Sequence, residues 1–370
     1  MSSIKAEHAS YADEKPVQVG EVARSGAEPL PPASWETTST LSTEPRAWSK
    51  PGDGTAAPGS QPSRMGVEAD ARPQKEIIAV GGGKGGIGKS LISSNLAVHL
   101  SQQGKKVVLL DADLGGANLH TCLGMPLPKS TLSDFVNRRV PDLTHVITPT
   151  GFPNLGLISG ALDVLGAANP KYTEKLRLLR EIARLDVDCV IIDLGGGTGF
   201  NILDFFLIAD HGILAVVPEP TSIENAYRFI KAACYRRLKM LEVEWNLKPV
   251  VEEAMSERDS RGLKTPADLL AYVEKKEPEA GARLRAELDR FPLYLIVNQA
   301  RTPEEHQLGK SIADACRRYF GIQMKYLGAI PYDDAVWQAV RRRKPVVVDS
   351  PTAKASEQIR QIAATLGFRG

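Results

Sequence analysis

EIIAVGGGKGGIGKSLISSNLAVHL, residues 76–100, is the clearest indication of fold in this 370-residue chain. Residues 76–80 are a short, mostly apolar run, and residues 81–90 are rich in glycine. Apolar residues then recur with helical spacing, at Leu91, Leu96, Val98 and Leu100. This order predicts a buried strand, a tight glycine loop and a helix that packs back on the strand.

Further apolar runs follow the same pattern along the chain. They occupy residues 105–113, 154–159, 189–195, 212–218, 292–300 and 325–331. Continuous apolar runs, rather than alternating ones, are typical of strands that are covered on both faces. With helices between them, they predict an α/β fold with a doubly wound, mostly parallel sheet.

The two ends of this pattern suggest the domain limits. Nine of the 25 prolines fall within residues 1–74, among Ser, Gly and Ala, and no apolar period persists there. Such a segment buries too little apolar surface to offset its ordering entropy, so we expect a disordered tail. Residues 75–370 form the expected domain. A charged stretch at 244–290 has helical spacing without strand character and predicts a helical insertion.

Composition and cysteine spacing argue against several classes of protein. The formal net charge of +2 argues neither for nor against nucleic-acid binding, so any basic patch must be argued locally. The four cysteines lie far apart, which argues against a disulfide framework or a zinc site. No apolar stretch is long enough to span a bilayer, and the first ten residues lack the apolar core of a secretory signal. We therefore expect a cytoplasmic protein.

The glycine loop carries the clearest chemistry. Residues 83–90, GKGGIGKS, match the phosphate-binding pattern G-x-x-x-x-G-K-[ST] at every position. Glycines let several backbone N–H groups approach phosphate oxygens, and the helix that follows directs its positive end at the anion. Lys89 supplies a charge to the β- and γ-phosphates, and Ser90 supplies a hydroxyl to Mg²⁺. The loop predicts a P-loop ATPase that uses ATP and Mg²⁺.

The earlier lysine of the loop, Lys84, completes the motif K-G-G-x-G-K-[ST]. This deviant form resembles the MinD/ParA family of P-loop ATPases over residues 75–367, apart from the charged stretch. The resemblance implies a homodimer that forms on ATP binding, in which Lys84 reaches the nucleotide of the opposite subunit. There it would neutralise charge on the transferred phosphoryl group, as an arginine finger does.

Two further segments resemble the switches of that family. DADLGGAN, 111–118, resembles switch I, which assigns Asp113 to the attacking water and the Mg²⁺ shell. CVIIDLGGGTGFNILDFFLIAD, 189–210, resembles Walker B followed by switch II, so Asp193 would hold the Mg²⁺ shell. The expected metal residues are therefore Ser90, Asp113 and Asp193, and the expected catalytic residues are Lys84, Lys89 and Asp113. The run of glycines after Asp193 departs from the D-x-P/A-G of many relatives.

The resemblance also implies a base site. Asn298, at the end of an apolar run, matches the asparagine that reads adenine, although a strand-end cap is the alternative for this side chain. Pro331 matches the loop that covers the base. The remaining residues expected to bind nucleotide are those of the loop: Gly83, Lys84, Gly85, Gly86, Ile87, Gly88, Lys89, Ser90 and Leu91.

Residues 217–239 are most similar to the FlhG-like branch, the MinD-related regulators of flagellar number, which act through protein partners. A ParA-like ATPase that binds DNA nonspecifically is the main alternative, with Arg341, Arg342, Arg343 and Lys344 as its candidate basic patch. Arg236, Arg237 and Lys239 could extend that patch. A P-loop carrier of metal clusters is a second alternative, disfavoured because such carriers need clustered cysteines.

Overall fold

The computed structural model describes residues 75–113, 116–160, 172–245 and 265–368, which lie in one compact unit, Gly59–Gly370. These residues form an eight-stranded sheet in the order β3-β4-β2-β5-β1-β6-β7-β8. Every neighbouring pair is parallel except β3 with β4. The strands are β1 Glu76–Gly81, β2 Val107–Asp111, β3 Thr148–Pro149, β4 Leu155–Ile158, β5 Cys189–Asp193, β6 His211–Val216, β7 Leu293–Ala300 and β8 Met324–Pro331.

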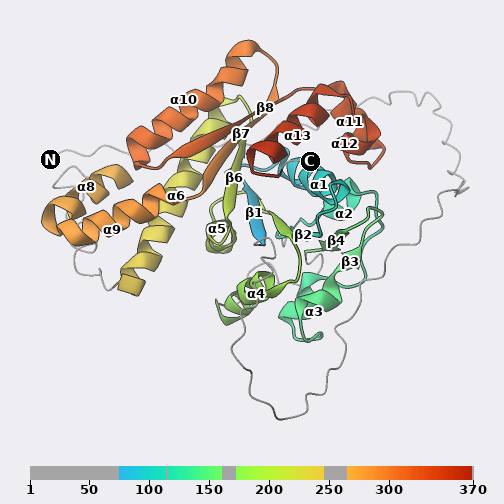
Figure 1. The fold of residues 1–370 in the computed structure, drawn as a ribbon, viewed down its shortest axis with the longest axis horizontal. Coiled ribbons are helices and arrows are strands. Elements are labelled where there is room, and N and C mark those ends of the chain that lie inside the picture. The colour runs from blue at the N-terminus through green and yellow to red at the C-terminus, as the bar shows by residue number, and fades with distance from the viewer. Residues whose placement is uncertain (1–74, 114–115, 161–171, 246–264, 369–370) are drawn as a thin grey trace, which may run out of the picture. The chain divides into compact units, whose positions relative to one another are not determined.

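Helices cover both faces of this sheet, so the predicted doubly wound fold is confirmed (Figure 1). On β1, Ile77 and Ala79 face one hydrophobic cluster, while Ile78 and Val80 face the other. The helical segments are α1 Lys89–Gln102, α2 Leu119–Cys122, α3 Leu132–Val136, η1 Leu143–Val146, α4 Tyr172–Arg184, α5 Phe200–Leu207, α6 Pro220–Trp245, α8 Pro266–Lys276, α9 Pro278–Asp289, α10 Pro303–Phe320, α11 Asp334–Arg341, α12 Val346–Asp349 and α13 Lys354–Thr365.

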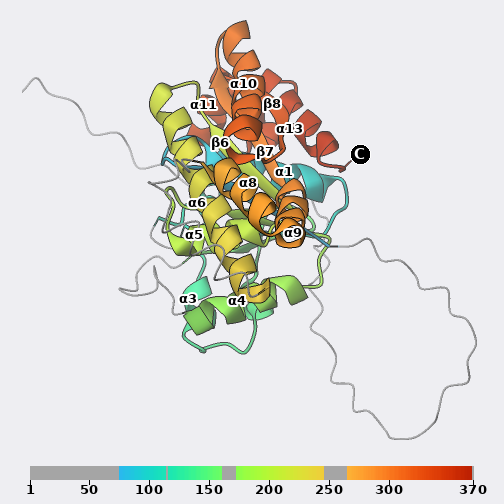
Figure 2. The same cartoon turned by 90° about the vertical axis from the view of Figure 1, so that its left-hand side faces the viewer.

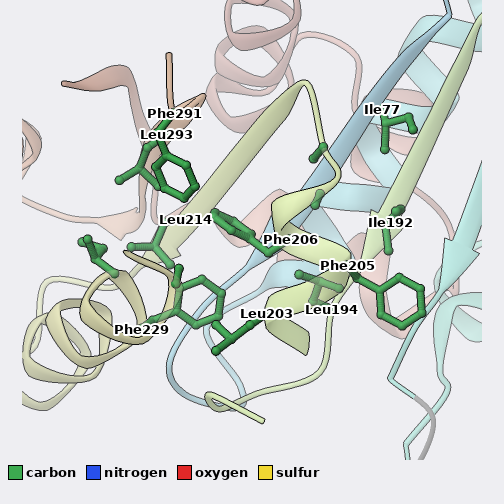
Figure 3. Packing of buried hydrophobic residues seen from close by; sticks show 14 of the residues in the cluster. Ile77, Ile192, Leu194, Leu203, Phe205, Phe206, Leu214, Phe229, Phe291 and Leu293 are labelled. Atoms are coloured by element: carbon green, nitrogen blue, oxygen red, sulfur yellow. The ribbon is translucent and has the colours of Figure 1, made fainter. Parts of the chain in front are cut away.

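One face of the sheet carries α1, α12 and α13, and the other carries α5, α6 and α10. Aromatic rings fill the second face beneath α5 and α6 (Figure 3). There Phe206 makes a T-shaped contact with Phe229, with ring centroids 4.9 Å apart, and also approaches Phe291. This packing fixes α5, the helix that follows the predicted switch II, against the centre of the sheet.

The charged stretch forms helices where the structure describes it. Helices α8 and α9 pack on each other, and α8 also contacts α6 and α10 (Figure 2). Helix α8 begins at a capping box in which Thr265 and Asp268 exchange hydrogen bonds, with Pro266 in the first turn. Its Leu269 and Val273 are buried, as the apolar spacing predicts. Residues 246–264 and the predicted tail, 1–74, lie outside the described residues.

Candidate nucleotide site

The predicted phosphate loop connects β1 to α1 at the carboxyl edge of the sheet. Gly86 and Gly88 have φ of 75° and 89°, in the left-handed region where glycine is free of strain. Gly88 is the N-cap of α1 and no side chain caps that helix. The first N–H groups of α1 are thus available to an anion, as phosphate binding requires.

Lys89 is the buried cation of this loop. Its side chain is 7% exposed, and its ammonium donates to the carbonyl oxygen of Lys84 at 3.2 Å. Burial lowers the pKa of Lys89, and the nearby carboxylates of Asp193 and Asp113 oppose that effect. A partly desolvated ammonium inside the loop is suited to bind phosphate, because phosphate oxygens can replace the missing water.

Asp193 lies at the end of β5 and is almost fully buried. Its two oxygens accept hydrogen bonds from Ser90 Oγ at 2.6 Å and from Ser93 Oγ at 2.9 Å. Burial raises the pKa of Asp193 to about 6, against the effect of both hydroxyls. Sequence reasoning missed Ser93, although its place one helical turn after Ser90 is a signal that it shares that face.

The donor set fits Mg²⁺. Magnesium takes few protein ligands and keeps several waters together with phosphate oxygens. The Ser90 hydroxyl and the Asp193 carboxylate supply such a set beside the loop. A fixed cation there would also stabilise carboxylates that burial otherwise disfavours. Among the residues that the structure describes, no group of three or more His, Cys, Asp and Glu could hold a metal by itself.

Asp111 and Asp113 bring the first switch segment to the same edge. Asp111 is the register partner of Asp193 on the neighbouring strand, and it accepts hydrogen bonds from the N–H groups of Leu119 and Asp113. Burial, with the Asp193 charge second, raises the pKa of Asp111 to about 7. Asp111 therefore supports the loop through these two hydrogen bonds. Residues 114–115 of this segment lie outside the described residues.

The second switch segment lies against both other loops. The Gly197 N–H donates to the Gly82 carbonyl at 3.4 Å. A Cβ at Gly195 would lie 3.1 Å from Asp113 Oδ1, and one at Gly196 would lie 3.0 Å from the Gly85 nitrogen. These approaches explain Gly195 and Gly196, since side chains there would push the three loops apart, while Gly197 has a φ of 105° that favours glycine. The structure therefore brings together the three segments that the sequence singles out.

Lys84 differs from Lys89 in its surroundings. Its side chain is 43% exposed, and its ammonium lies 3.1 Å from Glu219 Oε2, in the link between β6 and α6. Glu219 is itself 57% exposed, so this pair is a weak surface contact that can be exchanged at small cost. Sequence reasoning missed Glu219, because the two residues are far apart along the chain.

Asn298 is buried and donates from Nδ2 to the Ile87 carbonyl at 2.8 Å. This contact ties the end of β7 to the phosphate loop and matches the structural alternative for the side chain. Adenine recognition by Asn298 stays a prediction. Pro331 ends β8 as the register partner of Ala300, and the Arg301 guanidinium lies 3.7 Å from the Tyr332 ring centroid in the adjoining loop.

Much of the candidate basic patch is engaged within the protein. Arg342 pairs with Asp349 at 2.9 Å, and Arg343 donates to the Met125 carbonyl at 2.7 Å. The two arginines suggested as helpers, Arg236 and Arg237, bind Asp204 and Glu287. Those contacts leave fewer cations for DNA phosphates than the sequence indicates.

The fold and the loop together define a P-loop NTPase. The chain belongs to the ParA/MinD family within that class: the ParA family profile, described as NUBPL iron-transfer P-loop NTPase, matches residues 74–260. Within the described residues, no helix has the length and apolar character to cross a bilayer.

Relatives extend over most of the chain. It is 28% identical over 291 residues to the antiactivator FleN of Pseudomonas aeruginosa, covering 78% of this chain and 85% of FleN. It is 31% identical over 308 residues to the flagellum site-determining protein YlxH of Helicobacter pylori, covering 80% and 83%. The fold is similar to that of the septum site-determining protein MinD of Pyrococcus horikoshii, solved with Mg-ADP, with a TM-score of 0.54, 21% identity and coverage of 79% and 96%.

Proposed function

We propose that this protein is an ATP-binding, slowly ATP-hydrolysing cytoplasmic switch that dimerises on ATP and regulates the number or placement of flagella. The relative YlxH supports the flagellar role by its description as a flagellum site-determining protein and by coverage of 83% of its length. The antiactivator FleN, covered over 85% of its length, supports a regulatory role. We propose that the switch acts through a protein partner.

ATP binding is assigned to the loop residues from Gly83 to Leu91. The uncapped start of α1 and the buried Lys89 ammonium would hold the phosphates. Ser90 and Asp193 would hold Mg²⁺, the first directly and the second through water. The metal, when bound, neutralises phosphate charge and orients the γ-phosphate. Asn298 and Pro331 are proposed to position the base.

Hydrolysis needs an oriented water and charge stabilisation. We assign the orientation of this water to Asp113, whose side chain lies beside the Gly195 backbone where both switch segments meet. With one carboxylate and no dedicated base, turnover should be slow. Lys84 of the opposite subunit would supply the charge stabilisation.

One observation carries the dimer proposal: the loop has two lysines with separate environments. Lys89 would serve the phosphate position from within, whereas Lys84 is exposed and, in the described part of the chain, its ion pair is with Glu219. An exposed cation on a weak pair can leave it and bind a nucleotide in trans. ATP between two subunits then favours the dimer, and loss of the γ-phosphate releases it.

A mixing experiment tests whether Lys84 acts in trans. Lys84→Ala and Asp113→Ala should each hydrolyse ATP poorly alone. In a mixed dimer, the Asp113→Ala subunit still supplies Lys84 to the site of the Lys84→Ala subunit, where Asp113 is intact. The mixture should therefore recover activity that neither variant has. A mixture no more active than the sum of its parts would refute catalysis in trans.

A further inference from the structure

A groove runs beside the free edge of β8. The sheet ends at this strand, which pairs with β7 on one side, and no other strand among the described residues covers its outer edge. Helices α10 and α13 both pack on β8 (Figure 1). A hollow of about 590 Å³ opens there, with Ala329 and Pro331 of β8 in its lining. This volume is in the usual range for ligand pockets.

An open strand edge is a binding surface for extended chain. It presents N–H and C=O groups that a further strand can pair with, and proteins normally cover or blunt such edges. Here the end of β8 faces a hollow instead. An extended segment of about four residues spans roughly 13 Å, the length of the last residues of β8. Main-chain pairing of this kind is how many domains take up extended peptides.

Positive charge at the mouth of the groove favours an extended segment that carries a carboxylate. Arg301 and Lys354 are exposed, line the hollow, and form no ion pair in the described part of the chain. Arg301 is oriented by stacking on the Tyr332 ring at 3.7 Å. Glu357 is the acidic residue of the lining, and its carboxylate accepts a long hydrogen bond from Gln361 at 3.4 Å. The cations therefore face solvent and suit a carboxylate ligand.

We propose that this β8 groove is a docking site for an extended, acidic segment of a partner protein. The segment adds to the edge of β8 as a further strand and places an Asp or Glu side chain between Arg301 and Lys354. The amide groups of Gln358 and Gln361, on the α13 side, offer further donors and acceptors to its backbone. This inference goes beyond the proposed switch, although Pro331 borders both this hollow and the proposed base site, so the test below uses the nucleotide-free protein.

Selection from a random heptapeptide display library tests the proposal on the full chain. Peptides selected on the wild type should carry Asp or Glu within an alternating, β-branched sequence. Their affinity should fall about tenfold or more in the Arg301→Glu/Lys354→Glu variant, because a hydrogen bond to a charged group is lost and like charges meet. Lys310→Glu, an exposed change on α10 outside the hollow, is the charge control and should bind as the wild type does.

A second measurement distinguishes strand addition from simple charge attraction. N-methylation of alternate peptide bonds removes donors from one edge of the bound segment, so one of the two methylated registers should lose binding and the other should keep it. The proposal is overturned if no peptide is selected, if the double variant binds the selected peptides as well as the wild type, or if both methylated registers bind undiminished.

Discussion

The buried carboxylate of Asp204 should be a main determinant of stability around the switch. Asp204 lies on α5, just after the glycines that follow β5, and its side chain is 7% exposed. Arg236 of α6 binds both of its oxygens, at 2.8 and 3.1 Å, and the Lys175 ammonium of α4 contacts one of them. The carboxylate thus joins three helices.

Replacing Asp204 by alanine removes the carboxylate that both cations share. Breaking a buried ion pair from one side costs about 3–5 kcal/mol. Arg236 is 22% exposed and can turn toward water, whereas Lys175 is only 6% exposed, so the lower part of that range applies. For a domain of this size, such a loss corresponds to a fall in Tm of roughly 6–10 °C.

Urea and thermal unfolding of the nucleotide-free protein measure this loss. Glu224→Ala on α6 is the matched control, because its pair with Arg228 is exposed on both sides, and it should change stability by less than about 1 kcal/mol. The triple change Lys175→Met/Asp204→Leu/Arg236→Met should recover much of the loss, since apolar side chains can replace a buried ion cluster. An Asp204→Ala protein within about 1 kcal/mol of the wild type would refute this account of the cluster.

Two further predictions concern the nucleotide site. Lys89→Ala should keep the fold but lose most of its affinity for ATP–Mg²⁺ in calorimetric titration, because the buried loop cation is gone; wild-type affinity would contradict that role. Burial raises the pKa of Asp111 to about 7, above its ordinary 3.8, so the folded protein binds this proton more tightly and its stability falls as pH rises between those values. The stability of Asp111→Asn relative to the wild type should therefore rise as the pH is raised from about 4 to about 7 in urea unfolding, and a constant difference would contradict the link.

The sequence predicts most of this sheet because its strands are continuous apolar runs. Seven of the strands lie within or overlap the predicted runs, from β1 at Glu76–Gly81 to β8 at Met324–Pro331. The exception is β3, Thr148–Pro149, which has too few residues to show a period and exists only through its antiparallel pairing with β4. Tertiary contact, rather than local pattern, creates such a strand.

In the candidate site, too, the sequence predicts the residues that follow from local pattern and not those that depend on tertiary contact. Glycine spacing and strand ends locate Lys89 and Asp193, since both positions follow from local pattern. Ser93, Glu219 and Asp204 were missed because their roles depend on partners brought close only by the fold. Conversely, a run of charges in the sequence does not reveal which of them the fold neutralises, as the contacts of Arg342 and Arg343 show.

The mass of the protein in solution with ATP–Mg²⁺ and with ADP tests the central claim most directly. Light scattering should give a dimer for the wild type with ATP and a monomer with ADP, and Asp113→Ala should remain dimeric with ATP because hydrolysis is slowed. Lys84→Ala should bind nucleotide yet stay monomeric in both states, since the contact across the interface is lost. Identical wild-type masses with ATP and ADP would contradict the nucleotide-gated switch.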